Sequence, residues 1–143
     1  MEITVGSNSH SRRGRLNLYI IPALITGLIV MLLFVKKGYF IFGSESLACM
    51  DAQIQYVDFF SYLKNVLSGK DSILYTFNKG LGGSGIALFS YYLASPLNLF
   101  VYFVPVSYMP RFLDFLFAVK TMIAAATFSV YLDKRFSGAI KPI

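Results

Sequence analysis

The chain has 143 residues, of which 56% are hydrophobic and 14% charged, and its mean hydropathy is +0.61. Soluble domains are about 45–50% apolar and about 25% charged, so this composition excludes an ordinary soluble domain and favours a chain shielded by lipid. The net charge of +6 does not indicate nucleic-acid binding, because the basic residues flank long apolar segments instead of forming a patch. The single cysteine, Cys49, excludes an internal disulfide and a multi-cysteine metal site, and we expect it to be a small buried residue.

The first predicted element is a transmembrane helix over residues 16–35. Residues 1–15 are polar and predict a cytoplasmic tail, whereas residues 16–35 contain no charged side chain. At about 1.5 Å per residue, a helix of this length crosses a hydrocarbon core about 30 Å thick. Lys36 and Lys37 follow it in place of a small-residue cleavage site, so we expect a retained membrane anchor and not a removed signal peptide.

The next predicted element is an amphipathic helix over residues 51–68. Its apolar residues recur at helical spacing, while Asp51, Gln55 and Asp58 fall at positions i, i+4 and i+7 on the other side. A helix of this kind lies flat on a membrane with its apolar side down. We therefore expect it to rest at the interface, within a loop over residues 36–111.

Residues 86–106 carry no charge, and hydropathy alone predicts that they span the membrane. The tyrosines and prolines among them favour an interfacial or re-entrant helix instead. A span here would place Lys134 and Arg135 outside the cell, against the positive-inside rule. We therefore predict that residues 86–106 form a second membrane-lying helix of the loop.

The last predicted elements are a transmembrane helix over residues 112–132 and a cytoplasmic segment over residues 133–143. Small residues recur along the helix at 3/4 spacing and predict a packing face against another helix: Ala118, Thr121, Ala125 and Ser129. The fold class that follows is an all-α integral membrane protein, with two transmembrane helices flanking an extracytoplasmic loop that carries membrane-lying amphipathic helices.

Asp51 is the main candidate for catalysis. A carboxylate at the start of an interfacial helix can take a proton from an acceptor hydroxyl, although a helix N-cap is the simpler interpretation. Lys120 lies inside the second predicted span, where a cation either snorkels to the interface or contacts a lipid-linked phosphate. Residues 80–85 match G-x-G-x-x-G, but they lack the βαβ context that dinucleotide binding requires. The alternative that their backbone N–H groups bind a phosphate is kept.

Four stretches of the chain, in this order, resemble the YfhO family of bacterial membrane proteins. They are Gly38-Tyr39-Phe40-Ile41-Phe42-Gly43, Asp51-x-x-x-Gln55-Tyr56, Gly80-Leu81-Gly82 and Tyr91-Tyr92-Leu93-Ala94-Ser95-Pro96-Leu97-Asn98-Leu99. The resemblance covers about residues 16–135, and it is the order of the motifs that makes it specific. Proteins of this family look like glycosyltransferases of the GT-C architecture.

The resemblance implies transfer of a sugar from a polyprenyl-phosphate donor to a cell-envelope polymer such as teichoic acid. In enzymes of this architecture, the first outer loop holds an essential acidic residue. Asp51 lies where that residue is expected, so the resemblance implies that Asp51 is the catalytic base. Gln55 and Tyr56 would then bind acceptor or phosphate, and Lys120 the donor phosphate. Some enzymes of this architecture use a divalent metal ion, and the sequence leaves that cofactor open. The implied partners are membrane lipids, the polyprenyl-linked sugar and the polymer acceptor, with no nucleic acid, and the implied location is multi-pass in the bacterial plasma membrane.

Family members are several times longer, so we expect this chain to be the N-terminal part of a longer enzyme and to be inactive by itself. The competing hypothesis is a non-enzymatic membrane protein, such as a component of a lipid-carrier flippase or a scaffold. A reading frame that continues with further spans favours the enzyme, whereas a natural stop after Ile143 favours an accessory protein.

Overall fold

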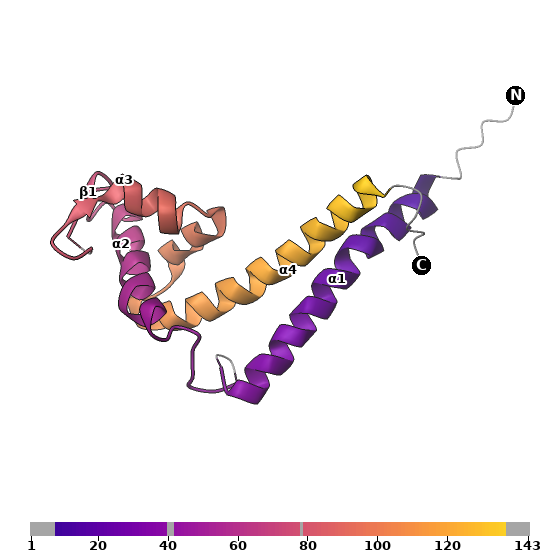
Figure 1. Ribbon diagram of the computed structural model, residues 1–143, viewed down its shortest axis with the longest axis horizontal. Helices are drawn as coiled ribbons and strands as arrows, with labels where there is room; N and C mark the ends of the chain where they lie inside the picture. Colours follow the sequence, from indigo (N-terminus) through magenta and orange to yellow (C-terminus); the bar gives the residue numbers. More distant parts are fainter. Residues whose placement is uncertain (1–7, 40–41, 78, 137–143) are drawn as a thin grey trace, which may run out of the picture. The chain divides into compact units, whose positions relative to one another are not determined.

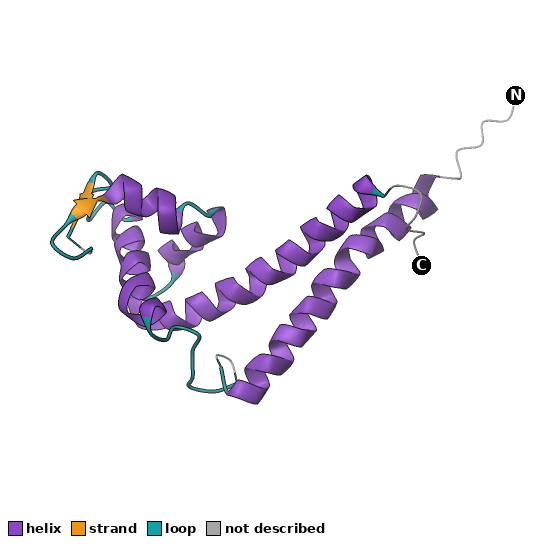
Figure 2. Cartoon of the chain, viewed as in Figure 1, coloured by secondary structure: helices purple, strands orange, loops and turns teal. Residues whose placement is uncertain are grey.

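The computed structural model describes residues 8–39, 42–77 and 79–136, which fall into two compact units. We call the described part of residues 1–33 and 118–143 the helix-pair unit, and the described part of residues 34–117 the loop unit. Figure 1 traces the chain, and Figure 2 shows that most of it is helical, with a single small pair of strands in the part that the structure describes.

The elements of the described chain are mostly helices. In chain order they are α1 (Asn8–Lys37), η1 (Ala52–Tyr56), α2 (Val57–Leu67), β1 (Tyr75–Thr76), β2 (Gly83–Ser84), α3 (Gly85–Leu88), η2 (Phe89–Leu93), η3 (Pro96–Phe103), η4 (Val106–Tyr108) and α4 (Met109–Arg135). The elements η1 and η2 are single π-helical turns, and η3 and η4 are 3₁₀-helices. The sequence predicts one helix over residues 51–68. In the structure, η1 and α2 follow each other there without a break.

Among the described residues, two helical stretches are long and apolar enough to cross a membrane, Leu16–Lys37 within α1 and Val106–Arg135, which joins η4 to α4. A helix suits the bilayer because it satisfies every interior backbone N–H and C=O within itself. The all-α membrane class predicted from sequence is therefore confirmed. The side of the membrane on which the loop unit lies stays a prediction.

Helix α1 begins earlier than the sequence indicates. It starts at Asn8, inside the segment that we assigned to a polar tail. Once a helix is nucleated, each added residue gains a hydrogen bond, so a stable apolar helix extends readily into polar neighbours. The remainder of the predicted cytoplasmic segments, residues 1–7 and 137–143, lies outside the described residues.

The helix-pair unit brings α1 close to α4 at a glycine. A Cβ atom on Gly27 would lie 3.0 Å from Met122 Sδ, so glycine allows the approach. Farther along, Tyr19 Oη donates a hydrogen bond to Asp133 Oδ2 at 2.8 Å. The small residues predicted as a packing face all lie on the partly buried side of α4: Ala118, Thr121, Ala125 and Ser129.

The core of the loop unit forms where α2 packs against the helices that follow it and against the start of α4. Helix α2 contributes Phe59, Phe60 and Leu63, whose i, i+1, i+4 spacing puts them on one side of the helix. The complete set of buried core residues is Phe59, Phe60, Tyr62, Leu63, Leu88, Leu93, Val101, Met109, Phe112 and Leu116. This core gives the loop unit a packed interior of its own.

Residues 86–106, which the sequence predicts as the second membrane-lying helix of the loop, are not one continuous helix. The segment is broken, and Gly85–Leu93 meets Pro96–Phe103 at 106°. Proline at the first position of η3 ends the preceding helix, because Pro96 restricts the backbone of Ser95 to an extended conformation. Buried Asn98 stabilises the bend, since its Nδ2 donates to the carbonyl oxygens of Tyr92 at 3.4 Å and Leu93 at 3.2 Å.

Cys49 is exposed, contrary to the expectation that it is buried. Its neighbour Ala48 occupies the buried position instead. Cys49 is followed by a turn at Met50, whose φ of 50° lies in the left-handed region. The sequence pattern alone does not reveal this turn, because Met50 is not a residue that usually adopts such a conformation.

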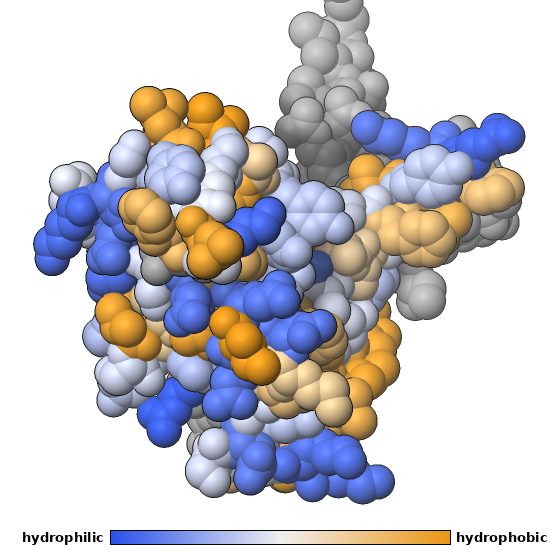
Figure 3. All heavy atoms as spheres, turned by 60° about the vertical axis from the view of Figure 1, so that its left-hand side comes forward, coloured by the Kyte–Doolittle hydropathy of each residue, from blue (hydrophilic) through white to orange (hydrophobic). Residues whose placement is uncertain are grey.

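The surface of the loop unit mixes polar and large apolar side chains, and Figure 3 shows both kinds interspersed on one face of the molecule. Leu81 is fully exposed, and Met50, Phe77 and Tyr91 are each about four-fifths exposed (83%, 78% and 81%). Exposure of so many large apolar residues is unfavourable in water but natural at a membrane interface.

Candidate functional site

The segment that leads to Asp51 is anchored on α4 by a buried carboxylate. Asp114 is completely buried, and its Oδ1 accepts hydrogen bonds from Ser46 Oγ at 3.0 Å and from Leu47 N at 2.8 Å. Ser46 Oγ also accepts a hydrogen bond from Ala48 N at 3.0 Å. Burying a carboxylate is costly unless it is hydrogen-bonded, so these contacts fix residues 46–48 against the start of the second span.

Asp51 stands at the entrance to the π-helical turn η1. It follows Met50, whose left-handed backbone is uncommon for a residue other than glycine. The Asp51 side chain is exposed and makes no capping hydrogen bond to the helix. The simpler interpretation of Asp51 as an N-cap is therefore not supported, and its carboxylate is available to a bound molecule. Single π-turns of this kind often occur at functional sites.

A cleft of about 340 Å³ opens on the next turns of the same helix. Four polar side chains line it, Gln55, Asp58, Lys79 and Tyr92, and the lining is completed by Ile54, Phe59 and Gly80. Its volume lies at the lower end of the range for small-molecule sites, about 300–1,000 Å³. An amide, a carboxylate, an ammonium group and a phenol thus face one partly enclosed space.

Only one of the residues predicted to form a site lies in this cleft. Gln55 lines it, and Asp51 precedes Gln55 by four positions on the same helical run without lining the cleft itself. The Tyr56 ring packs edge-on against Tyr92, with ring centroids 5.2 Å apart, and therefore supports the wall of the cleft. Lys120 is exposed on α4 in the helix-pair unit.

Asp58, Lys79 and Tyr92 are the cleft residues that sequence reasoning did not assign to the site. Asp58 was visible in the amphipathic pattern, because it falls on the polar side of the helix with Asp51 and Gln55. Lys79 and Tyr92 are far from that helix in sequence, so no local spacing connects them to it. Only the folded loop unit brings the three together.

The glycine-rich segment forms a hairpin and not a nucleotide-binding turn. Strand β1 pairs antiparallel with β2, so that Tyr75 faces Ser84 and Thr76 faces Gly83. Gly82 has a φ of 106°, and a Cβ atom there would lie 2.2 Å from Tyr75 Oη, so only glycine fits this position. The tip of the hairpin carries Lys79 and Gly80 and thereby brings a cation to the cleft.

Tyr62 ties α2 to the segment that precedes this hairpin. Its buried Oη donates a hydrogen bond to the Ser72 carbonyl oxygen at 2.7 Å. Burial and, to a smaller extent, the negative charge of Asp71 raise the pKa of the Tyr62 phenol above its ordinary value of 10.0. The phenol therefore keeps its proton, and with it this hydrogen bond, throughout the physiological pH range.

The family resemblance leaves a divalent cation open, so the arrangement of possible metal ligands matters. Within residues 8–39, 42–77 and 79–136, no three His, Cys, Asp or Glu side chains converge as they would around an ion. The cleft offers a single carboxylate, Asp58, whereas calcium and magnesium sites use several oxygen ligands. These residues therefore do not fit a metal ion by themselves.

Comparison with known proteins identifies the family. The family model of the bacterial membrane protein YfhO matches residues 22–141, which include most of the first candidate span, all of the second, the π-helical turn and the cleft. No curated protein and no solved structure matches the chain. With most of its length matched, the chain belongs to the YfhO family of bacterial membrane proteins.

Proposed function

We propose that the chain is part of a glycosyltransferase that moves a sugar from a polyprenyl-phosphate donor to a cell-envelope polymer such as teichoic acid. The observation that carries this proposal is the cleft in which Gln55, Asp58 and Lys79 face one space, next to the exposed carboxylate of Asp51. Amide and carboxylate groups suit sugar hydroxyls, and an ammonium group suits a phosphate. The amphipathic surface of the loop unit is consistent with a substrate carried by a lipid.

The proposed transfer is a displacement at the anomeric carbon of the donor sugar. The acceptor hydroxyl oxygen forms a bond to this carbon, the bond between sugar and phosphate breaks, and polyprenyl phosphate leaves with the bonding electrons. Asp51 takes the hydroxyl proton as general base. Gln55 and Asp58 hold sugar hydroxyls, and Lys79 pairs with the phosphate. Lys120 remains the candidate from sequence for a second contact to the donor phosphate.

The proposed location is the plasma membrane of a bacterium, crossed more than once by the protein. The two candidate spans support multiple crossings. Basic residues flank them at Arg12, Arg13 and Arg15 before the first, and at Lys134 and Arg135 at the end of the second. By the positive-inside rule these ends are cytoplasmic, which puts the loop unit on the outer side, where a cell-envelope acceptor is found.

The test is a transfer assay in membrane vesicles that contain the full-length protein of which this chain is a part, with a radiolabelled polyprenyl-phosphate sugar and teichoic acid as acceptor. We expect the Asp51→Asn variant to transfer label at least ~100-fold more slowly, because a general base contributes about 10²–10⁴-fold. Lys79→Gln should raise the KM for the donor more than it lowers kcat. Asp71→Asn, which removes an exposed carboxylate outside the cleft, is the matched control and should leave transfer unchanged.

The outcomes separate the residue assignment from the function. Unchanged transfer by Asp51→Asn, with loss of transfer in Asp58→Asn, moves the role of base to the acid inside the cleft. Unchanged transfer by both variants would show that neither acid is needed, and that the cleft is not the site of the reaction. If the folded full-length wild-type protein transfers no label, the non-enzymatic hypothesis of a lipid-carrier flippase component or scaffold is favoured instead.

A further inference from the structure

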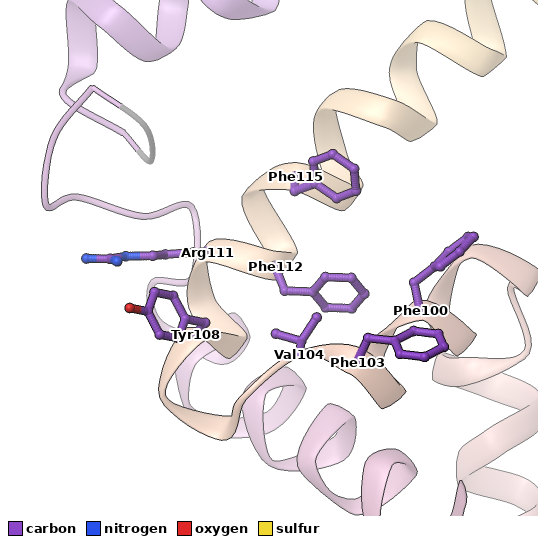
Figure 4. A pocket seen from close by; sticks show the side chains of 7 residues that line it. All are labelled: Phe100, Phe103, Val104, Tyr108, Arg111, Phe112 and Phe115. Carbon is purple, nitrogen blue, oxygen red and sulfur yellow. The ribbon is translucent and has the colours of Figure 1, made fainter.

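A second cavity of about 350 Å³ lies in the loop unit at the start of the second span. Figure 4 shows the seven residues that line it: Phe100, Phe103, Val104, Tyr108, Arg111, Phe112 and Phe115. It shares no lining residue with the polar cleft. All of its lining side chains are apolar or aromatic except Arg111, so the Arg111 guanidinium and the Tyr108 phenol are its polar groups, and it contains no carboxylate that could accept a proton.

The cavity has an apolar body and a cationic end. Figure 4 shows the rings of Phe100, Phe103 and Phe112 around one space, and Arg111 and Tyr108 together on the other side of the start of α4, with the Arg111 side chain extending away from the phenylalanine rings. The Arg111 guanidinium carbon lies 5.1 Å from the centroid of the Tyr108 ring, within the range of a cation–π contact. A guanidinium group has five N–H donors, so it can bind a phosphate in addition to the groups that it already contacts.

The cavity is held in place by contacts with the core of the loop unit, while several of the phenylalanine rings that line it are exposed. Lys64 Nζ of α2 donates a hydrogen bond to the Val104 carbonyl oxygen, and Val101 next to it is completely buried. By contrast, Phe103 is 78% exposed, and Phe100 and Phe115 are more than half exposed. Large aromatic rings with this exposure belong at a membrane interface, where lipid chains cover them.

We propose that this cavity binds an anionic phospholipid of the surrounding membrane, with a segment of one acyl chain among the phenylalanine rings and the phosphate on Arg111. The apolar lining suits a hydrocarbon chain, and the positive charge at one end selects a headgroup with net negative charge. The site lies where the candidate span Val106–Arg135 begins, which is where headgroups are located. The proposal is independent of the sugar-transfer reaction and concerns a lipid that is bound and not consumed.

The test is native mass spectrometry of the full chain released from nanodiscs made of equal parts phosphatidylcholine and phosphatidylglycerol. The wild-type protein should retain phosphatidylglycerol in at least ~10-fold preference, since a charge-assisted contact to phosphate is among the stronger hydrogen bonds. Arg111→Gln should abolish the preference. Arg135→Gln, which removes a cation at the other end of α4, is the matched control and should keep it.

A second measurement needs no substitution. Phosphatidylglycerol with a photoreactive group on its acyl chain should label peptides within residues 100–115 of the wild-type protein, and excess unlabelled phosphatidylglycerol should suppress the labelling. Equal retention of both lipids by the wild type, or a preference unaltered in folded Arg111→Gln, overturns the proposal. So does displacement of the label by a polyprenyl phosphate but not by phosphatidylglycerol, which would identify the cavity as part of the donor site.

Discussion

The helix-pair unit and the loop unit use apolar residues in opposite ways. In the helix-pair unit, one large apolar side chain after another is exposed, as with Leu24, Leu28 and Leu32, each between 57% and 60%. In the loop unit, α2, η2, η3 and the start of α4 bury Leu63, Leu93 and their neighbours almost completely. The first pattern fits contact with lipid or with further helices, and the second is the interior of a small folded domain.

This difference shows that a high apolar content does not tell whether a given apolar residue faces lipid or packs in a protein core. Lipid tails are as apolar as leucine, so an apolar side chain on a spanning helix gains little by packing against another helix. A side chain buried in the loop unit instead leaves a cavity when it is truncated. Paired substitutions in the two units can therefore test the contrast directly.

The largest expected effect comes from truncating matched leucines. Leu93→Ala should lower the free energy of unfolding by about 2–5 kcal/mol, because Leu93 is completely buried and its removal leaves a cavity. Leu28→Ala on α1 should change it by less than about 0.5 kcal/mol, because Leu28 is 57% exposed. Denaturant titration of the purified chain in detergent micelles, followed by circular dichroism, measures both. Equal losses would show that the two units do not differ in this way.

The next effect comes from two carboxylates of α4. Asp114→Ala removes the acceptor for Ser46 Oγ and Leu47 N in the loop unit, and should cost about 2–3 kcal/mol because two hydrogen bonds to a charged group are lost and the partly buried Leu47 N–H loses this partner. Asp133→Ala removes one partly buried bond to Tyr19 in the helix-pair unit, and should cost about 1 kcal/mol or less. The same titration compares them. Asp114→Asn keeps an acceptor oxygen and should recover most of the loss, whereas an Asn variant as damaging as Ala would mean that the charge itself is required.

The sequence predicted well the features that depend on local patterns. The absence of charge over residues 16–35 identified the first span, and the spacing of Asp51, Gln55 and Asp58 identified the helix formed by η1 and α2. Both signals come from residues within a few turns of each other, where helix geometry sets which side chains share a face. Membership of the YfhO family followed from motifs that the family model also matches.

Features that depend on contacts between distant residues were not predicted. The contacts of Asp114 could not be predicted, because nothing local connects it to Ser46 and Leu47, more than sixty positions away (68 and 67). Lys79 reaches the cleft only through the hairpin. The break at Pro96 was missed because hydropathy averages over the segment and ignores the backbone restriction that proline imposes.

The smallest expected effect comes from adding a methyl group to matched glycines. A Cβ atom on Gly85 would lie 2.2 Å from Tyr62 Oη and 2.3 Å from the Ile73 carbonyl oxygen, so Gly85→Ala should cost about 1–2 kcal/mol through overpacking in the loop unit. On Gly27 the nearest atoms, at 3.0 Å, belong to the flexible end of the Met122 side chain, which can move aside.

Gly27→Ala should therefore change the free energy of unfolding by less than about 0.5 kcal/mol, since the better helix propensity of alanine offsets the tighter contact. Gly85→Ala in a Tyr62→Phe background removes the clash with the hydroxyl and leaves only the backbone clash, so part of the loss should be recovered. A larger loss at Gly27 than at Gly85 would show that the helix-pair unit is the more tightly packed of the two, and would reverse the contrast between them.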